Sequence, residues 1–460
     1  MRVLHVGSGF RPLRLGGLVA YTEELMNEQV RRGDEVAYFF SGRYYRYLGG
    51  PRLKRWSRDG VTMLEVVNSP LHDHGRQPEL ELDEPATERL FERAIRHTSP
   101  EVVHFHELAG LPSSLLEAVR AAETPTLMTL ADYFPLCSTF KLFDSEGRVC
   151  LRREVGADCV ATTAADPRPP GLLYEATARH ELMTRRVLNR LPRGLARPLV
   201  RAAGSRVQSP PAASAKTFQN RREINVERLN RIDRLIAISE RVAEIYSLLG
   251  VDRRRISTIH PTLTRIERLR PRRRKASPPV AFATIAGLSS HAKGSRLLVD
   301  AVRLLSDSVP TGSFRLLALG AVDPSVAAEV ERLEEIEAGA PGPFSDDQLD
   351  ALLDEVDVGV VPSIWEEAYG FVGPEFLAKG IPVIANAIGG MPEYTRDGET
   401  GWLNRSCSAA ELARIMRDIV ERPEQVAQLN AKVLADRRNI IKPMPRHGDE
   451  IDAVYRELCS

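Results

Sequence analysis

Residues 361–403 read VPSIWEEAYGFVGPEFLAKGIPVIANAIGGMPEYTRDGETGWL, and this stretch decides the fold. An apolar run over residues 358–361, ended by a proline, predicts a buried parallel strand. Pro374 suits the first helical position, where its missing N–H costs nothing, and we expect that helix to end at Gly380. Residues 383–385 predict a second strand, and a diglycine turn follows it. A strand, a loop, a helix and a strand in this order predict one repeat of a parallel α/β sheet.

The loop and helix of this stretch carry two glutamates that are separated by seven residues, Glu367 and Glu375. Gly370 and Gly373 bracket the loop, and glycines there let the backbone approach a ligand closely. The free N–H groups at the helix start favour an anion such as a diphosphate. The loop carboxylate can orient sugar hydroxyls, and the helix carboxylate can accept two adjacent ribose hydroxyls. The sequence therefore predicts a nucleotide-sugar site at the strand ends.

The whole ordered string resembles the GT4 family of retaining glycosyltransferases with the GT-B fold, also called glycosyl transferases group 1. Its hallmark is a Glu, seven residues and a second Glu, then a Pro-Val strand and a Gly-Gly-x-Pro-Glu turn. Each piece is present here in that order. Taken alone, the two glutamates would fit an ordinary helix start with surface carboxylates. The resemblance implies transfer of a hexose from a nucleotide-diphospho-sugar to a hydroxyl acceptor, with retention of anomeric configuration.

Length, charge and cysteine content limit the class of protein. A chain of 460 residues predicts two or three domains. A formal charge of +1 gives no general attraction to nucleic acid, so no nucleic-acid partner is expected. There is no run of eighteen apolar residues, and Met1 leads straight into a predicted strand, which indicates neither a membrane span nor a signal peptide. Five cysteines, an odd number, argue for the cytoplasm, with a peripheral position on the inner membrane face left open.

Strands and helices alternate along the chain, which predicts an α/β fold with parallel sheets. The predicted strands are residues 3–6, 35–40, 102–105, 126–130, 235–238 and 256–259 in the first half, and 280–285, 314–319, 358–361 and 383–385 in the second. We expect the GT-B architecture, two Rossmann-like domains whose parallel sheets face each other across a cleft.

The expected domains follow from this alternation. Residues 1–264 form an acceptor-side domain with a helical and basic insertion at about 150–225, and residues 276–435 form the nucleotide-sugar-binding domain. The basic, proline-containing segment 265–279 is interpreted as a linker. The tail is expected to be helical with breaks at Pro443 and Pro445. The resemblance implies that the final helix, residues 436–460, crosses back to the first domain.

In the first domain, polar residues follow the predicted strands. Gly16 and Gly17 come before the first helix and can bring backbone N–H groups to a diphosphate. Strand alternation places His104 and His106 on one face, with His104 structural. The stretch resembles the family motif Pro-Asp-x-x-His-x-His, which implies that His106 faces the reacting sugars. Asp132 follows the next strand and is an acceptor-side candidate, although Ala131 replaces the histidine found in many relatives.

In the second domain, the segment 286–294 resembles the family's Gly-Arg-Leu and Lys-Gly pattern. Lys293 matches the lysine, which would stabilise the leaving diphosphate. Gly287 stands at the position of the family arginine, so one cation is missing, and His291 or an arginine from elsewhere could replace it. The resemblance also implies that Glu375 holds the ribose and that Glu367 holds sugar hydroxyls. The resemblance further implies that the backbone amides of Gly370, Phe371 and Val372 also hold sugar hydroxyls.

No Asp-x-Asp pair is placed to hold a divalent ion, so transfer without a metal or other cofactor is expected. Cys137, Cys150 and Cys159 cluster in the sequence, and we favour free thiols over a zinc site because they lack Cys-x-x-Cys spacing. The arginine-rich segment from Leu182 to Arg206 has three interpretations: a solvated insertion, which we favour, a surface on anionic lipid, or a pocket for an acidic acceptor.

Two alternatives to transfer follow from the missing arginine and histidine. A non-catalytic protein would bind a nucleotide-sugar without turning it over, and an epimerase on the same fold would convert the donor without an acceptor. The paired glutamates favour transfer over both. The nucleobase, the sugar, the acceptor and the oligomeric state are not specified by the sequence.

Overall fold

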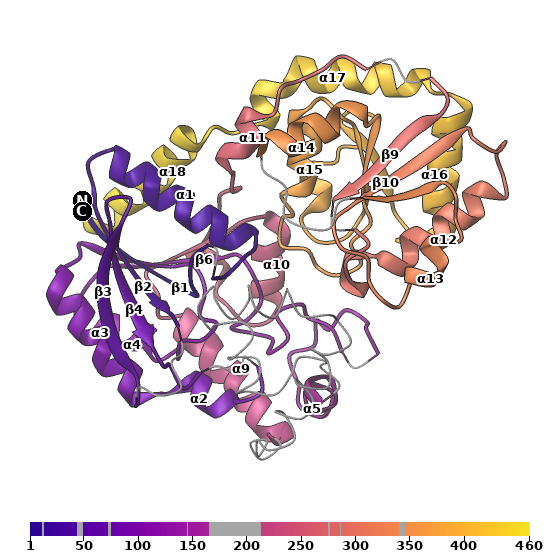
Figure 1. Ribbon diagram of the computed structural model, residues 1–460. Helices are drawn as coiled ribbons and strands as arrows, with labels where there is room; N and C mark the ends of the chain where they lie inside the picture. Colours follow the sequence, from indigo (N-terminus) through magenta and orange to yellow (C-terminus); the bar gives the residue numbers. More distant parts are fainter. Residues whose placement is uncertain are drawn as a thin grey trace. The chain divides into compact units, whose positions relative to one another are not determined.

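The computed structural model describes residues 1–11, 13–43, 49–71, 75–144, 146–164, 213–274, 277–285, 287–339 and 346–460. The chain divides into two compact units (Figure 1). Unit 1 comprises Met1–Ile238, Val242–Pro261 and Gly448–Ser460, and unit 2 comprises Ser239–Arg241 and Thr262–His447. The arginine-rich segment 182–206 lies outside the described residues. No helix of the described part is long and apolar enough to cross a membrane.

Unit 1 is built on a mixed sheet with the strand order β3-β4-β2-β1-β5-β6-β7-β8. Its strands are β1 (Arg2–Gly7), β2 (Glu35–Ser41), β3 (Arg52–Arg58), β4 (Val61–Val67), β5 (Val102–Phe105), β6 (Thr126–Leu130), β7 (Arg234–Ala237) and β8 (Ile256–Thr258). β3 pairs antiparallel with β4, and the other pairs are parallel. The predicted strands of this half are confirmed, with end shifts of one residue at most.

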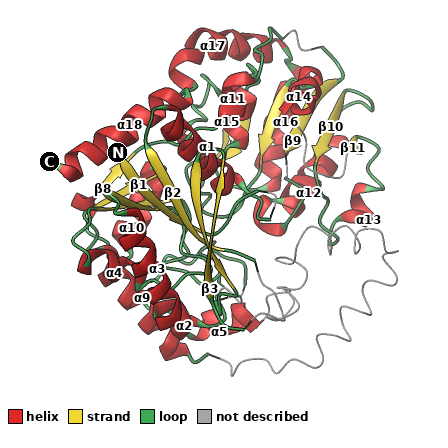
Figure 2. Cartoon of the chain, turned by 60° about the vertical axis from the view of Figure 1, so that its left-hand side comes forward, coloured by secondary structure: helices red, strands yellow, loops and turns green. Residues whose placement is uncertain are grey.

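Helices cover both faces of this sheet (Figure 2). They are α1 (Gly17–Arg31), α2 (Pro78–Leu82), α3 (Pro85–Thr98), α4 (Leu115–Ala121), α5 (Ala157–Ala164), α9 (Ala215–Leu229), α10 (Glu240–Leu248) and the C-terminal helix α18 (Met444–Cys459). Phe91 of α3 packs on Phe105 of β5 with ring centroids 6.1 Å apart. His104 points to the opposite face, where its ring lies 5.7 Å from that of Tyr455 in α18.

The C-terminal helix joins unit 1 through α1. Arg32, the residue after α1, pairs with Asp449 at 2.7 Å and with Asp452 at 2.8 Å. The predicted break at Pro443 is confirmed, but the break at Pro445 is wrong. Pro445 lies in the first turn of α18, where a residue without an N–H does not interrupt the hydrogen-bond pattern.

Unit 2 holds a parallel sheet with the order β11-β10-β9-β12-β13-β14. Its strands are β9 (Val280–Ile285), β10 (Phe314–Leu319), β11 (Ile336–Gly339), β12 (Val358–Val361), β13 (Val383–Asn386) and β14 (Gly401–Asn404). The predicted strands are confirmed, and β13 extends one residue further than predicted. The order reverses between β9 and β12, and such a reversal is where α/β sheets bind ligands at the carboxyl ends of their strands.

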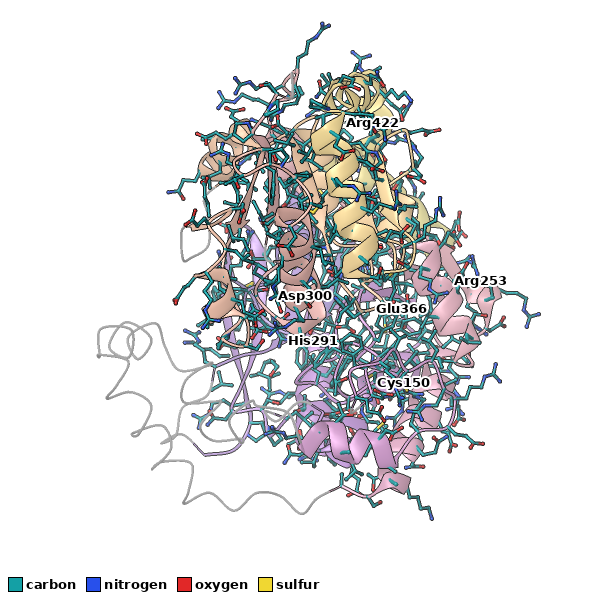
Figure 3. All side chains as sticks on the ribbon, turned by 90° about the vertical axis from the view of Figure 1, so that its right-hand side faces the viewer. Cys150, Arg253, His291, Asp300, Glu366 and Arg422 are labelled. Atoms are coloured by element: carbon teal, nitrogen blue, oxygen red, sulfur yellow. The ribbon has the colours of Figure 1, made fainter. Side chains whose placement is uncertain are left out.

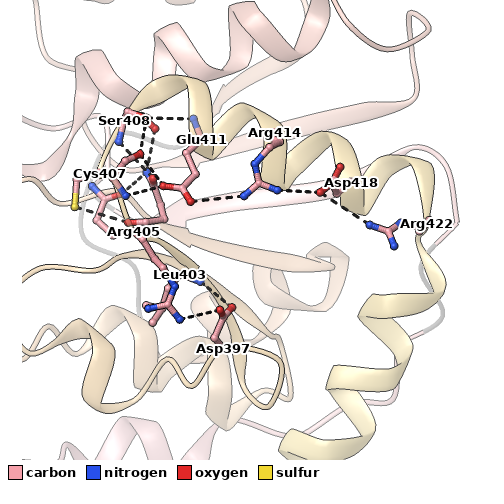
Figure 4. Close-up of polar contacts among 12 residues, drawn as sticks. Asp397, Leu403, Arg405, Cys407, Ser408, Glu411, Arg414, Asp418 and Arg422 are labelled. Carbon is pink, nitrogen blue, oxygen red and sulfur yellow. Dashed lines mark hydrogen bonds and ion pairs between the residues drawn. The ribbon is translucent and has the colours of Figure 1, made fainter.

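The helices of unit 2 are α11 (Thr264–Arg268), α12 (Ser295–Ser306), α13 (Ala327–Val330), α14 (Asp346–Leu352), α15 (Val372–Ala378), α16 (Ala409–Glu421) and α17 (Glu424–Ile440). The helix predicted from Pro374 to Gly380 is α15, which begins and ends two residues earlier. α16 starts in a reciprocal cap (Figure 4), because Ser408 Oγ accepts the N–H of Glu411 at 3.2 Å and Glu411 accepts the N–H of Ser406 at 2.6 Å.

The segment interpreted as a linker, residues 265–279, is part of unit 2. Arg274 is buried, and its guanidinium donates to the carbonyls of Asp354 at 2.6 Å and Leu353 at 2.7 Å. Arg270 pairs with Asp350 at 2.7 Å while its side chain stays exposed. Both arginines therefore tie this basic segment to unit 2.

Candidate functional site

Lys293 and Glu367 meet at the carboxyl edge of the unit 2 sheet. Lys293 follows β9 and Glu367 follows β12, and Lys293 Nζ lies 2.6 Å from Glu367 Oε2. Gly294 makes this approach feasible, because a Cβ there would overlap the carbonyl of Pro362 and its φ is +79°. The structure therefore brings together two residues that the sequence predicted for one site.

Glu367 is held by more than the lysine. The same Oε2 accepts the indole N–H of Trp365 at 3.0 Å and the hydroxyl of Ser363 at 3.1 Å. Lys293 Nζ lies 5.6 Å from the centroid of the Trp365 ring. These bonds hold the carboxylate in one position.

The predicted backbone donors lie beside this carboxylate. Gly370 has φ +78°, and a Cβ there would lie 3.1 Å from Glu367 Cγ. Phe371 and Val372 cap and begin α15, and all three residues are half-buried rather than enclosed. The loop therefore keeps its backbone near the surface next to Glu367.

Glu375 lies in the first turn of α15 and is 1% exposed. Its carboxylate pairs with Arg265 of α11, whose side chain is 36% exposed. A buried carboxylate requires such compensation. Sequence reasoning missed Arg265 because it assigned that residue to a linker. Arg265, Lys293, Glu367 and Glu375 are together called the charged site.

Glu366, the residue before Glu367, contacts a different set of partners. Glu366, labelled in Figure 3, accepts Arg241 Nη2 at 2.6 Å and the N–H of Gly389 at 3.1 Å. Glu393 of the predicted diglycine turn accepts the backbone N–H groups of Glu240 and Arg241, both at 3.0 Å. These two carboxylates anchor the backbone of unit 2, which leaves Glu367 as the one of the adjacent pair that faces Lys293.

The position of the missing arginine is crowded by Thr284. A Cβ on Gly287 would overlap Thr284 Oγ1 and lie 2.9 Å from Thr284 Cβ. The Thr284 side chain would therefore have to move before a longer side chain could stand at this position. His291, the alternative that the sequence suggested, lies in the short turn before Lys293 and is exposed.

In unit 1, His106 lies just past β5 and is 2% exposed. Its Nε2 is 2.8 Å from Nδ1 of His5, a residue of β1, and the two rings stack at 5.1 Å. His104 is fully buried and bonds Tyr455 and Thr129, each at 2.7 Å. The predicted common face is confirmed, since the centroids of His104 and His106 are 4.0 Å apart. His5, His104 and His106 are together called the histidine site.

Among the described residues, the three histidines of the histidine site form a group that could hold a metal ion. One ring nitrogen of each histidine lies within 4.8 Å of those of the other two. Both ring nitrogens of His5 and His104, and Nε2 of His106, lie within hydrogen-bond distance of protein atoms. A metal would have to break several of these bonds, so the arrangement fits a hydrogen-bond network better than an ion. Burial lowers the pKa of His5 to about 4, which keeps the imidazole neutral.

The cysteines do not join such a group within the described chain. The thiols of Cys137, Cys150 and Cys159 are free, and only Cys150 is buried. None of the three therefore forms a disulfide, and two of the three thiols are half-buried, so the predicted burial holds only for Cys150. The choice between free thiols and a zinc site stays a prediction.

A second polar cluster follows β1, β5 and β6. Glu107 accepts Arg14 Nη2 at 2.8 Å and also the hydroxyl of Ser8. Asp132 is half-buried and accepts the N–H of Phe134 at 2.9 Å. Burial and the nearby charge of Glu107 raise the pKa of Asp132 to about 7. Sequence reasoning found Asp132 but missed its charged neighbours, which come from separate loops.

Gly16 and Gly17 form an open turn at the start of α1. Both are exposed, Gly16 is the N-cap with φ 141°, and a Cβ on Gly16 would meet no atom within 4 Å. No side chain caps the first turn of this fifteen-residue helix. Its N–H groups are therefore accessible to a ligand.

Comparison with known proteins identifies the family. The family model described as Glycosyl transferase 4-like domain matches residues 16–262, more than half of the chain, and the one described as Glycosyl transferases group 1 matches residues 280–422. The D-inositol 3-phosphate glycosyltransferase of Streptomyces scabiei is 30% identical over 222 residues, which cover 44% of this chain and 49% of that protein. The chain thus spans about half the length of the curated relatives it matches.

Solved structures show the same fold. HepE of Anabaena in complex with UDP superposes with a TM-score of 0.58 at 14% identity, covering 99% of this chain and 100% of that one. Sucrose-phosphate synthase from Thermosynechococcus elongatus gives 0.62 at 14% identity, covering 100% and 99%. The chain has the GT-B fold and belongs to the glycosyl transferase 4-like family.

Proposed function

We propose that the chain transfers a sugar from a nucleotide-diphospho-sugar to a hydroxyl acceptor, with retention of configuration and without a metal ion. The observation that carries this proposal is the pairing of Lys293 with Glu367 at the carboxyl edge of the unit 2 sheet. Family membership supports it, because both residues lie in the range 280–422 that the group 1 model matches, and they resemble the family's lysine and first glutamate.

The charged site suits a donor that is both anionic and rich in hydroxyls. Glu375 accepts the two ribose hydroxyls, and Arg265 balances its charge before the donor arrives. Lys293 is 35% exposed, so its ammonium can reach the diphosphate while Glu367 accepts a sugar hydroxyl. As the glycosidic bond breaks, negative charge grows on the diphosphate, and a fixed ammonium stabilises that charge more than it stabilises the ground state.

Unit 1 supplies the acceptor side in this proposal. His106 and Asp132 follow neighbouring strands, β5 and β6, and both can bond hydroxyl groups. The open turn at Gly16 and Gly17 offers further backbone donors to the diphosphate.

The relatives suggest the first substrates to test. HepE was solved in complex with UDP-glucose, so UDP and its sugars come first on the donor side. The Streptomyces scabiei relative is named for D-inositol 3-phosphate, so phosphorylated polyols come first on the acceptor side.

Thermal unfolding with UDP, GDP, ADP, dTDP and their sugar conjugates tests the donor site. A ligand at 100 times its dissociation constant stabilises by about 2.7 kcal/mol, which for a domain of this size is roughly 5–10 °C. The shift should appear with one nucleotide family and disappear in Glu375→Gln. Glu329→Gln, which removes a half-buried carboxylate of unit 2 that pairs with Arg296, is the matched control and should keep the shift. No shift with any nucleotide would overturn the donor site.

Turnover distinguishes the proposal from binding alone. The enzyme should release nucleotide faster when an acceptor is present, and chelator treatment should not change the rate. The anomeric configuration of the product, read by NMR, should equal that of the donor. Binding without release of nucleotide would favour the non-catalytic alternative, and conversion of the donor without an acceptor would favour the epimerase.

A further inference from the structure

Four buried residues from four different elements of unit 1 form one chain of hydrogen bonds. Tyr455 of α18, Gln29 of α1, His5 of β1 and His106 after β5 are each at most 2% exposed. Gln29 Nε2 donates to the Tyr455 hydroxyl at 3.3 Å, and Gln29 Oε1 lies 2.6 Å from His5 Nε2. His5 Nδ1 then lies 2.8 Å from His106 Nε2. These four residues are called the relay.

Burial makes the direction of each bond in the relay matter. Water does not reach these atoms to satisfy a mismatched donor or acceptor, and a buried mismatch costs about 1–3 kcal/mol. An amide oxygen can only accept, so the proton between Gln29 and His5 belongs to His5 Nε2. A neutral imidazole carries one N–H, so His5 Nδ1 must accept. The remaining bond therefore requires the proton on His106 Nε2.

We propose that Gln29 and His5 are positioning residues that fix His106 as the Nε2–H tautomer, with Nδ1 as its acceptor nitrogen. The low pKa of His5 supports this, because an imidazolium at His5 would donate from both nitrogens and reverse the last bond. The catalytic consequence rests on the proposed function: an acceptor nitrogen on His106 can take a hydrogen bond from a substrate hydroxyl. The tautomer itself does not depend on that function.

A branch from the C-terminal helix continues the relay. In the orientation that the structure gives, Gln29 Nε2 donates to the Tyr455 hydroxyl at 3.3 Å. That hydroxyl has one proton of its own, which it can give to His104 Nδ1 at 2.7 Å. His104 can then donate from Nε2 to Thr129 Oγ1 at 2.7 Å. This branch is compatible with the proposed direction, and one hydroxyl of α18 links the relay to β5.

The opposite direction is the alternative that an experiment must exclude. With the amide turned over, every bond in the relay reverses, and His106 carries its proton on Nδ1. The two forms have the same heavy-atom positions, but the nitrogen left to accept differs. Hydrogens decide between them, so the measurement must report on nitrogen protonation.

Long-range ¹H–¹⁵N spectra of the full chain, labelled with ¹⁵N-histidine, make that measurement at neutral pH. His106→Gln and His5→Asn assign the two sets of signals by their loss. We expect His106 to show a protonated Nε2 and an unprotonated Nδ1, and His5 to show the same pattern. A protonated Nδ1 on His106 would overturn the proposal.

Variants test the cause. Gln29→Met removes both hydrogen bonds at nearly constant side-chain length, and it should leave His106 as a mixture of tautomers. Thr129→Val removes a hydrogen bond of His104 outside the relay, and it should leave His106 unchanged. A single Nε2–H tautomer of His106 in folded Gln29→Met would show that the relay does not set it.

Activity provides the second readout. With an identified donor, Gln29→Met should lower kcat about tenfold and leave the KM for the donor unchanged. A tenfold loss is smaller than the full contribution of a well-placed acid or base. His5→Asn places an amide oxygen where Nδ1 lies and should retain most of the activity. Loss of the tautomer without loss of kcat would overturn the positioning role. Absence of nucleotide binding would instead count against the proposed function and leave the tautomer result standing.

Discussion

The charged site lies at the carboxyl ends of the unit 2 strands and the histidine site lies on β1 and β5 of unit 1, and the two differ in their electrostatics. The charged site consists of full charges, and each carboxylate is matched by a cation or several donors, as Glu367 is by Lys293 at 2.6 Å. The histidine site is more deeply buried and consists of imidazole rings linked by hydrogen bonds, and burial keeps the His5 ring neutral.

Under the proposed function, this difference corresponds to two kinds of ligand. A diphosphate would bring negative charge, which the partly exposed ammonium of Lys293 would neutralise. A hydroxyl would bring no charge and would need only a correctly directed lone pair or proton. Charge complementarity tolerates small shifts in geometry, whereas the direction of a hydrogen bond does not. The following predictions separate these two requirements.

The largest effect is expected at Lys293. Lys293→Met removes the ammonium that meets the leaving diphosphate and should lower kcat by about 10²- to 10³-fold, the usual loss for one preorganised group in a transition state. Glu367 keeps its bonds to Ser363 and Trp365, so the thermal stability should change little. Steady-state kinetics checks this, with Lys432→Met, an exposed lysine of unit 2, as the control. A kcat within a few-fold of wild type would contradict the charge requirement.

The second effect concerns the neutral rings of the histidine site. The pKa of His5 is lowered to about 4 in the folded chain, against about 6.5 in the unfolded chain. Below pH 6.5 the unfolded chain therefore binds more protons, and stability falls as the pH falls. The loss should be about 2 kcal/mol at pH 5 and about 3 kcal/mol near pH 4.

Denaturant titrations at pH 7 and pH 5 measure this loss. His5→Asn should be less stable than wild type at pH 7 but should lose less on acidification. His97→Gln, at an exposed position of α3, is the control and should follow the wild-type profile. Equal acid sensitivity of wild type and His5→Asn would show that other groups cause the loss.

The third effect concerns the buried carboxylate of the charged site. Arg265→Gln leaves Glu375 without its cation and should destabilise unit 2 by about 2 kcal/mol, less than for a fully buried pair because Arg265 is 36% exposed. Glu375→Gln added to this variant should recover part of the loss, since the double variant buries no charge. Denaturant midpoints of the single and double variants complete the cycle. Strict additivity would mean that the pair is not coupled. Arg303→Gln, from an exposed pair, is the control.

The two sites also differ in how much of them the sequence predicts. Glu367, Glu375 and Lys293 lie in two short segments, each attached to a strand with a clear apolar run, so their meeting follows from strand order. The histidine site and the relay together draw on residues 5, 29, 104, 106 and 455. Only His104 and His106 were recognised, because alternation along one strand is visible in the sequence and contacts between distant elements are not.

The strands that were missed escaped prediction for different reasons. β3 and β11 are the outer strands of their sheets, β14 is the other outer strand of unit 2, and β4 pairs with β3. β3 reads RLKRWSR, and its residues are largely exposed or half-buried. β3 thus carries charge instead of an apolar run, so hydrophobic patterning does not reveal it. β11 and β14 have only four residues each, too few for a clear period. β4 is a buried apolar strand that the sequence analysis overlooked. Arg265 was misassigned because composition says nothing about which acceptor an arginine reaches.

The smallest effect concerns Gly287, which follows β9 at the position of the family arginine. Gly287→Ala adds one methyl group that would overlap Thr284, a buried residue of β9, and overpacking of this kind should cost about 1–2 kcal/mol. Gly50→Ala, where a Cβ meets nothing within 4 Å, is the matched control and should change stability little. If Gly287→Ala is as stable as wild type, the backbone can yield, and Gly287→Arg should then raise kcat by adding the missing charge. If it is destabilised, an arginine cannot enter without moving β9. The charged site must then work with Lys293 and whichever cation approaches from another segment.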